Sequence, residues 1–310
     1  MYRAGQILSL IHEICEKSGL PKDKITALAY RNRPRYRIFH IHTGKKQRLI
    51  KAPIPSLRAA QKALAAIISE KLKPEECAHG YVTDRSVITH AASHLGKKAF
   101  FKTDIVDCFG SINFPEIANT LREAKYNSVD SFIAASIATD EGSLPQGAPS
   151  SPLLCNLVLR SVDRPLSKLA DKLCATYTRY GDDIVMSADD FDINIISIVR
   201  NVLSRHGFKM NEDKTYIAIE PQQNIITGIS IATGYPKVRK SFKRQVRLET
   251  HLLLKKGIVS YLESDGYIDP FAADRVLGKL TWWSHVEPDA EFPKKHSIMI
   301  RSMMKEVARG

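Results

Sequence analysis

The sequence lacks the cysteine patterns of a disulfide framework or a zinc site. Its five cysteines are odd in number, lie far apart along 310 residues, and include no Cys-x-x-Cys pair. Secreted disulfide scaffolds and zinc-binding domains both depend on closely spaced, paired cysteines. We therefore expect buried or neutral thiols that neither cross-link the chain nor bind metal.

Long hydrophobic runs are also missing. No apolar stretch approaches the ~20 residues that a membrane-spanning helix needs. Residues 1–19 carry charges where a signal peptide would have its apolar centre. We expect a cytoplasmic protein with no membrane partner.

Acidic residues are in short supply. The chain has 46 Lys and Arg against 33 Asp and Glu, a formal net charge of +13. Residues 31–51 contain eight basic residues and no acid, and 237–256 contain eight opposed only by Glu249. Such blocks are either solvated surface or a face for a polyanion, and the aromatic Tyr36 and Phe39 within the first block favour nucleic acid.

Hydrophobic periodicity predicts an α+β protein, with strands and helices mixed at first and helices alone from about residue 238. A basic hairpin is expected over 35–53, and a buried strand begins at Ala99 and ends near Asp104. Asn113 and Glu116 have the spacing of a capping box. The remaining expectations are helices over 7–14, 24–29, 57–72 with Ser56 as cap, one from 153 that Pro165 interrupts or kinks, and 195–203, and strands over 215–219 and 225–231.

Three aspartates stand where phosphoryl-transfer chemistry would need them. Asp104 ends a strand, whereas Asp182 and Asp183 occupy a tight turn between the strands 176–180 and 184–188. Two divalent cations require carboxylates that converge from separate strands, and oxygen ligands suit Mg²⁺. Taken alone, however, a Gly-Asp-Asp turn is also ordinary turn chemistry.

In combination, these segments resemble those of reverse transcriptases, in the order found in that family. The resemblance is carried by KTDIVDCFGSI (102–112), LPQGAPSSPLLCNL (144–157), YTRYGDDIVMSA (177–188), HGFKMNEDKT (206–215) and ITG (226–228). It implies a right-hand polymerase fold with fingers over 1–98, a palm over 99–235 that contains a fingers insertion near 113–150, and a helical basic thumb over 236–310.

The resemblance also implies roles for single residues. Asp104, Asp182 and Asp183 would hold two Mg²⁺ ions together with the Ile105 carbonyl, and Mn²⁺ could substitute. Phe109 would exclude a ribose 2′-hydroxyl, unless it is simply a core residue. Other residues implied to bind the incoming nucleotide are Lys46, Arg48, Arg85, Gln146, Gly147 and Lys214, although the charged ones could equally be exposed surface residues.

Basic side chains are implied to contact the nucleic acid through its phosphates and 2′-hydroxyls. They are Arg35 and Arg37 in the hairpin, and Lys240, Lys243, Arg244 and Arg247 in the thumb. Among these residues, the thumb set lies on one predicted helix.

Within the family, LPQGAPSSP and an ITG element before a basic helix are similar to bacterial retron enzymes. Gly181, where those enzymes usually have Ala, and the segment from His90 to His94 depart from that pattern. The likeness implies a structured noncoding RNA as template and primer, RNA-linked single-stranded DNA as product, a defence effector protein as partner and a role against phage. A group II intron-like or other defence-associated enzyme stays open, as do an RNA-dependent RNA polymerase and a catalytically silent RNA-binding scaffold.

Overall fold

The structure is a computed structural model that describes residues 9–30, 35–43, 46–221, 224–258 and 269–307. The chain divides into two compact units. The first unit comprises Met1–Ser86 and Lys97–Glu220, and the second comprises Val87–Gly96 and Pro221–Gly310.

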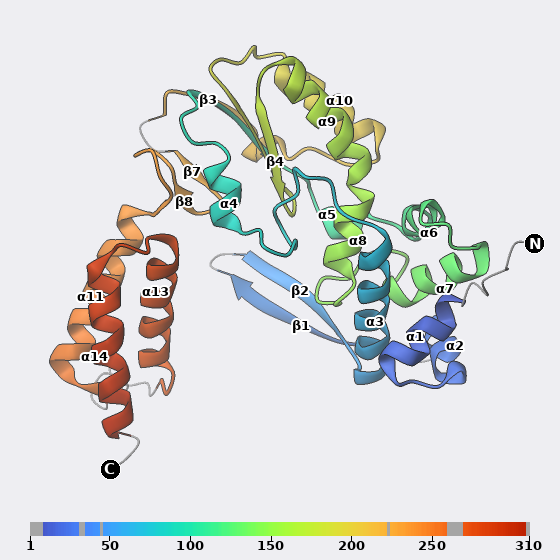
Figure 1. Ribbon diagram of the computed structural model, residues 1–310, viewed down its shortest axis with the longest axis horizontal. Helices are drawn as coiled ribbons and strands as arrows, with labels where there is room; N and C mark the ends of the chain where they lie inside the picture. Colours follow the sequence, from blue (N-terminus) through green and yellow to red (C-terminus); the bar gives the residue numbers. More distant parts are fainter. Residues whose placement is uncertain (1–8, 31–34, 44–45, 222–223, 259–268, 308–310) are drawn as a thin grey trace, which may run out of the picture. The chain divides into compact units, whose positions relative to one another are not determined.

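A four-stranded antiparallel sheet organises the first unit (Figure 1). Its strand order is β4-β5-β3-β6, with β3 at Ala99–Asp104, β4 at Thr176–Tyr180, β5 at Asp183–Ala188 and β6 at Tyr216–Ile219. Phe101 of β3 pairs with Met186 and Ile217 on its two neighbours, and Phe101 and Met186 are fully buried. Alternate residues of a strand share a face, so Phe101 and Met186 direct one face of the sheet into the core.

Helices supply most of the core of the first unit. They are α1 (Leu10–Ser18), α2 (Lys22–Ala29), α3 (Pro55–Lys71), α5 (Cys108–Ser111), α6 (Phe114–Glu123), α7 (Ser128–Ala138), α8 (Ser151–Val158), α9 (Arg160–Lys172), α10 (Ile195–Arg205) and the 3₁₀ turn η1 (Glu212–Lys214). Helix α9 packs on β4 and on α10, and α8 contacts α3, α5 and α6. All five cysteines are free; Cys77, Cys108 and Cys155 are buried, and Cys174 is exposed.

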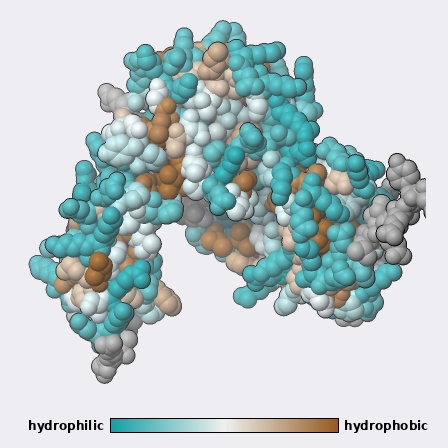
Figure 2. Space-filling model, viewed as in Figure 1, coloured by the Kyte–Doolittle hydropathy of each residue, from teal (hydrophilic) through white to brown (hydrophobic). Residues whose placement is uncertain are grey.

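The basic hairpin is a separate two-stranded ribbon in the first unit. Strands β1 (Tyr36–Thr43) and β2 (Lys46–Pro53) pair antiparallel, with Phe39 opposite Ile50. The turn residues 44–45 lie outside the described residues, as do Arg31, Arg33 and the expected helical residues Ile7 and Leu8. Hydrophobic surface is visible over the hairpin in Figure 2, and its exposed apolar side chains are Ile38, Phe39, Ile41 and Leu49.

Helix boundaries test the local predictions. The capping box of α6 is confirmed, because the Asn113 side chain accepts from the Glu116 amide and the Glu116 carboxylate accepts from the Asn113 amide. Ser56 as the cap of α3 is wrong: α3 begins at Pro55, which has no amide hydrogen to satisfy, after Ile54. The predicted interruption at Pro165 is also wrong, since Pro165 lies within α9 and the interruption falls at Leu159, between α8 and α9.

The second unit contains α4 (Val87–Ala92), a small antiparallel sheet of β7 (Ile225–Ile226), β8 (Ile229–Ser230) and β9 (Lys237–Val238), and the helices α11 (Lys240–Lys256), α13 (Ala272–Val286) and α14 (Glu291–Val307). The single strand predicted over 225–231 is therefore two. Thr227 and Gly228 have φ of 44° and 88°, which reverses the chain between β7 and β8. Both units combine helices with antiparallel strands, so the α+β class is confirmed.

No helix in the described part of the chain has both the length and the apolar composition needed to cross a bilayer.

Candidate active site

The strand register brings the three predicted aspartates to one end of the sheet. Asp104, the last residue of β3, pairs directly with Asp183, the first residue of β5. The Ile105 amide donates to the Asp182 carbonyl at 3.2 Å, which extends the ladder beyond the two strands. Gly181 has φ +64°, the conformation that a two-residue hairpin with Gly at its first position requires.

Burial and like charge create a strained electrostatic environment at this end of the sheet. Asp104 is buried, Asp183 is half-buried and Asp182 is exposed. Burial, with the neighbouring charges of Asp182 and Asp104, raises the pKa of Asp183 to about 6. Bringing a cation to these carboxylates would reverse that effect.

Lys214 supplies one such cation. It ends η1, and its ammonium donates to Asp104 Oδ2 across 110 residues of sequence. The hydrogen bond to Asp104 raises the pKa of Lys214, so the ammonium keeps its proton at neutral pH. The sequence predicted Lys214 near the nucleotide; its direct contact with Asp104 was not predicted.

Metal binding can be tested against the donor atoms. Among the described residues, no three His, Cys, Asp or Glu side chains form a group arranged to hold a metal ion. The donor chemistry of the end of the sheet nevertheless fits a hard divalent cation. Within the described residues, the buried Asp104 Oδ1 has no hydrogen-bond partner, and a carboxylate oxygen is the ligand that Mg²⁺ or Mn²⁺ prefers. The assignment of Asp104, Asp182, Asp183 and Ile105 as ligands stays a prediction.

The predicted nucleotide residues Gln146 and Gly147 lie against the hairpin. The Lys51 amide donates to the Gln146 carbonyl at 2.8 Å, and a Cβ added to Gly147 would lie 3.0 Å from the Lys51 carbonyl oxygen. The Lys51 ammonium also binds Asp140 and Glu141, at 2.7 Å each. Lys51, which sequence reasoning missed, therefore joins β2 to both ends of the segment 140–146.

The remaining nucleotide candidates occupy different environments. Phe109, on α5, is half-buried and meets the ring of Tyr81 edge to face, with 6.3 Å between the ring centroids. Arg48 is exposed on β2, whereas Lys46 begins β2 and its side chain lies outside the described set. Arg85 donates to the carbonyls of the loop before it, at Glu76 and Ala78.

Arg35, just before β1, and Arg37, within β1, differ in exposure. Arg37 is exposed and lies over the Phe39 ring, 5.9 Å from its centroid. Arg35 is buried, and its guanidinium donates to the carbonyls of Leu28, Ser136 and Thr139. The expectation that Arg35 meets nucleic acid is corrected accordingly: its donors join the helices of the first unit.

In the second unit, α11 carries the other basic candidates. Lys240 and Arg244 are exposed. Lys243 binds Glu287 at 2.6 Å. The exposed Arg247 lies over the ring of the buried Trp283, 5.2 Å from its centroid, and this contact limits the directions that its guanidinium can take.

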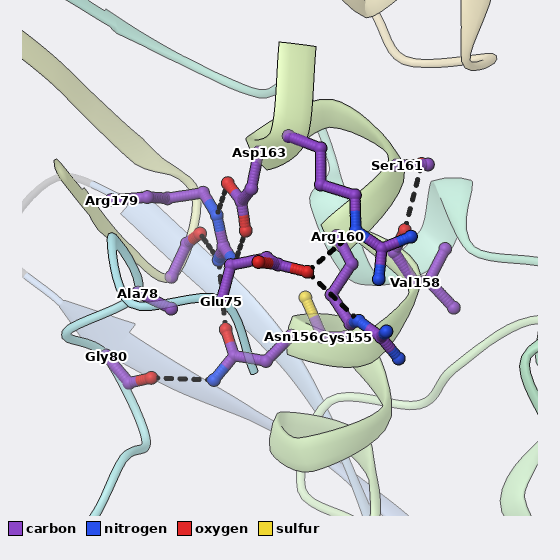
Figure 3. A network of polar contacts seen from close by, with 12 residues as sticks. Glu75, Ala78, Gly80, Cys155, Asn156, Val158, Arg160, Ser161, Asp163 and Arg179 are labelled. Atoms are coloured by element: carbon purple, nitrogen blue, oxygen red, sulfur yellow. Dashed lines mark hydrogen bonds and ion pairs between the residues drawn. The ribbon is translucent and has the colours of Figure 1, made fainter. Parts of the chain in front are cut away.

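Sequence reasoning missed a buried polar network behind the aspartate turn. Arg179 of β4 and Asp163 of α9 are both fully buried and form an ion pair, to which Asn156 of α8 is bonded (Figure 3). The only sequence signal is an arginine at an inward position of a strand, two residues after Tyr177.

Comparisons with known proteins identify the family of the chain. A family profile described as "Reverse transcriptase (RNA-dependent DNA polymerase)" matches residues 41–246. The retron Mx65 reverse transcriptase of Myxococcus xanthus is 30% identical, over 79% of this chain and 65% of that protein. The retron Ec86 reverse transcriptase of Escherichia coli is 25% identical, over 79% of this chain and 78% of that protein. The predicted likeness to retron enzymes is thus confirmed, although the chain spans only 65% and 50% of the Mx65 and Mx162 proteins of Myxococcus xanthus.

Solved structures with a similar chain trace include a telomerase from Candida albicans, with 11% identity, coverage of 92% of this chain and 64% of that chain, and a TM-score of 0.49. A foamy viral protease-reverse transcriptase follows with 14% identity, coverage of 89% and 39%, and a TM-score of 0.45. At such TM-scores these likenesses support no conclusion about this chain.

Proposed function

The chain belongs to the reverse transcriptase (RNA-dependent DNA polymerase) family, and from that membership we infer that it copies RNA into DNA by adding deoxynucleotides to a primer end. One observation of the structure carries the proposal. The register of β3 and β5 pairs Asp104 with Asp183 beside Asp182, as carboxylates that converge from separate strands must be paired.

The proposed chemistry assigns a task to each group at this end of the sheet. Asp104, Asp182, Asp183 and the Ile105 carbonyl would hold Mg²⁺ or Mn²⁺, which when bound activates the attacking hydroxyl and stabilises the charge of the triphosphate. Lys214 holds a proton on its ammonium next to Asp104 and is suited to donate it to the leaving pyrophosphate.

The sugar and base of the incoming nucleotide are assigned to neighbouring segments. Phe109 would exclude a 2′-hydroxyl, and Gln146 and Gly147 would border the nascent base pair. Lys46, Arg48 and Arg85 are proposed to bind the triphosphate. The fingers, palm and thumb boundaries at 1–98, 99–235 and 236–310 are part of the same proposal.

The template and product follow from the relatives. Because the curated relatives named above are retron enzymes, we propose a structured noncoding RNA as template and primer, and an RNA-linked single-stranded DNA as product. The exposed Lys240 and Arg244 would bind the phosphates of this nucleic acid. A defence effector protein as partner, and a role against phage, belong to the same proposal.

Two measurements test these statements. The first is incorporation of deoxy- or ribonucleoside triphosphates on a primed RNA template in Mg²⁺, with Asp182→Asn as the variant. Synthesis should be abolished while RNA binding persists; the matched control is Asp189→Asn, which alters an exposed aspartate just after β5 and should leave synthesis intact. Full activity of Asp182→Asn would refute the metal assignment, and ribonucleotide incorporation by the wild type would indicate an RNA polymerase.

The second measurement is sequencing of the nucleic acid that co-purifies with the protein. A branched RNA–DNA molecule is expected. Bulk cellular RNA would instead favour a group II intron-like or other general enzyme, and an absence of any synthesis with RNA bound would indicate a binding scaffold.

A further inference from the structure

The charged side chain of Arg179 is completely buried directly behind the aspartate turn. Its Nε and Nη2 donate to the two carboxylate oxygens of Asp163, at 2.9 and 2.7 Å. This fork-to-carboxylate pairing fixes the plane of the guanidinium. The remaining nitrogen, Nη1, donates to Asn156 Oδ1 and to the Gly181 carbonyl, both at 2.9 Å. Arg179 thus binds the peptide that immediately precedes Asp182.

Each partner of Arg179 is itself held in place. The Tyr177 hydroxyl donates to Asp163 Oδ1 at 2.8 Å. Asn156 Nδ2 donates to the Gly80 carbonyl at 2.8 Å (Figure 3). The network therefore joins α8, α9, β4 and the loop at Gly80 to the turn. Because several hydrogen bonds already fix the orientation of the Arg179 side chain, it loses little further freedom when it binds the Gly181 carbonyl.

The loop at Gly80 packs against the preceding peptide, between Tyr180 and Gly181. A Cβ added to Gly80 would lie 2.5 Å from the Gly181 nitrogen and 3.1 Å from the Tyr180 carbonyl carbon. Backbone bonds from Arg179 to Cys77 and from His79 to Arg179 fix that loop along β4. Gly181 is thus held on both sides: Arg179 binds its carbonyl, in the peptide with Asp182, and Gly80 packs against its nitrogen, in the peptide with Tyr180.

Stability alone is a poor explanation for these buried charges. Burying two ions removes their hydration, and well-packed apolar residues of similar volume often serve a fold equally well. What apolar residues cannot supply is a directed donor to the Gly181 carbonyl. We propose that Arg179, oriented by Asp163 and Asn156, is a positioning residue that sets the Gly181 peptide and thereby the direction of the Asp182 and Asp183 carboxylates relative to Asp104. The inference rests on the proposed function, because positioning matters through the cations that those carboxylates would hold.

The test removes the network without leaving an unpaired charge. In the triple variant Arg179→Met, Asp163→Leu, Tyr177→Phe, the buried pair and the hydroxyl bound to it become apolar. A second variant, Arg179→Lys, keeps the positive charge opposite Asp163 but lacks the planar fork. The control is Arg160→Met on the same helix α9, whose loss leaves Glu75 bound to Arg164 at 2.8 Å.

Three readouts are taken on the full-length chain. Thermal denaturation reports folding, hydrogen–deuterium exchange reports the backbone of the turn over 180–184, and Mn²⁺ binding is followed by electron paramagnetic resonance. In the triple variant and in Arg179→Lys we expect a folded protein, faster exchange confined to the turn, and Mn²⁺ affinity lowered by about ten- to 100-fold, the range for groups that orient metal ligands. The kcat should fall by a similar factor with little change in the KM for nucleotide, and Arg160→Met should change none of these.

The inference is overturned if the triple variant folds and its turn exchanges as slowly, and it binds Mn²⁺ as tightly, as in the wild type. If the triple variant does not fold, the same two measurements on Arg179→Lys decide: a loosened turn supports the inference and an unchanged one overturns it. The proposed function fails separately, because a wild-type protein that binds Mn²⁺ and protects its turn but makes no DNA contradicts only the assigned activity.

Discussion

Replacing Gly147 by alanine tests whether the loop at 144–147 must lie directly on the hairpin. Gly147 has φ +112°, a conformation that costs a residue with a Cβ about 1–3 kcal/mol. The new methyl group would lie 3.0 Å from both Ile50 Cγ2 and the Lys51 carbonyl oxygen. Ile50 can rotate its methyl away, but the Lys51 carbonyl belongs to a paired strand and cannot.

The loop must therefore move and lengthen the bond between the Lys51 amide and the Gln146 carbonyl, which is worth about 0.5–1.5 kcal/mol. Strain and the lost bond together lower the free energy of unfolding by about 1.5–4.5 kcal/mol. Domains of about 150–250 residues lose roughly 2–4 °C of Tm for each kcal/mol. Because Gln146 and Gly147 are proposed to border the nascent base pair, we also expect a higher KM for the incoming nucleotide.

The matched control is Gly142→Ala in the same loop. Gly142 also has a positive φ, +87°, but an added Cβ there would meet nothing within 4 Å. Thermal denaturation and nucleotide titration of both variants separate backbone strain from contact with the hairpin. Equal losses of Tm in the two variants, with an unchanged KM, would refute the reasoning.

Three further predictions concern single side chains. Phe109→Ala should lower the preference for deoxy- over ribonucleotides, measured as a ratio of kcat/KM values, and should forgo an edge-to-face contact with Tyr81 worth about 0.5–1.5 kcal/mol; unchanged sugar selectivity would remove the proposed gate. Asn113→Ala should destabilise α6 by about 1 kcal/mol, because it removes the acceptor for the Glu116 amide; a Tm equal to that of the wild type would contradict this. Burial lowers the pKa of His79 from 6.5 to about 4. The unfolded chain therefore takes up the proton first, so stability is complete above pH 6.5 and falls as the pH is lowered toward 4. Urea denaturation at pH 7 and pH 5 should show a smaller difference for His79→Gln than for the wild type, and equal differences would count against the shift.

Much of the fold could be predicted because the signals are local. The strand before Asp104 shows as an apolar run, the turn at Gly181 as glycine chemistry between two strands, and the start of α6 as a capping box. Each depends on residues within a few positions of one another, which is where sequence patterns are informative. The three candidate aspartates can therefore be singled out from local sequence alone.

What could not be predicted depends on contacts between distant segments. Arg35 reads as one more basic residue of the hairpin, yet two of its acceptors, at Ser136 and Thr139, lie about a hundred residues away. Lys243 likewise binds Glu287, the residue after α13, and Lys214 binds Asp104. Local periodicity carries no information on which charge will find a partner in the folded chain, so exposure of basic residues was the expectation that failed at Arg35.

Lys51 has a consequence for how the hairpin can respond to a bound molecule. Its amide binds Gln146 and its ammonium binds Asp140 and Glu141, so one residue of β2 ties down both ends of the 140–146 segment. Restricting the motion of either segment then restricts the other, and the entropy lost on ordering them is shared. Two molecules that each grip one of these segments should bind with positive cooperativity, even with no contact between them and no change in the average backbone.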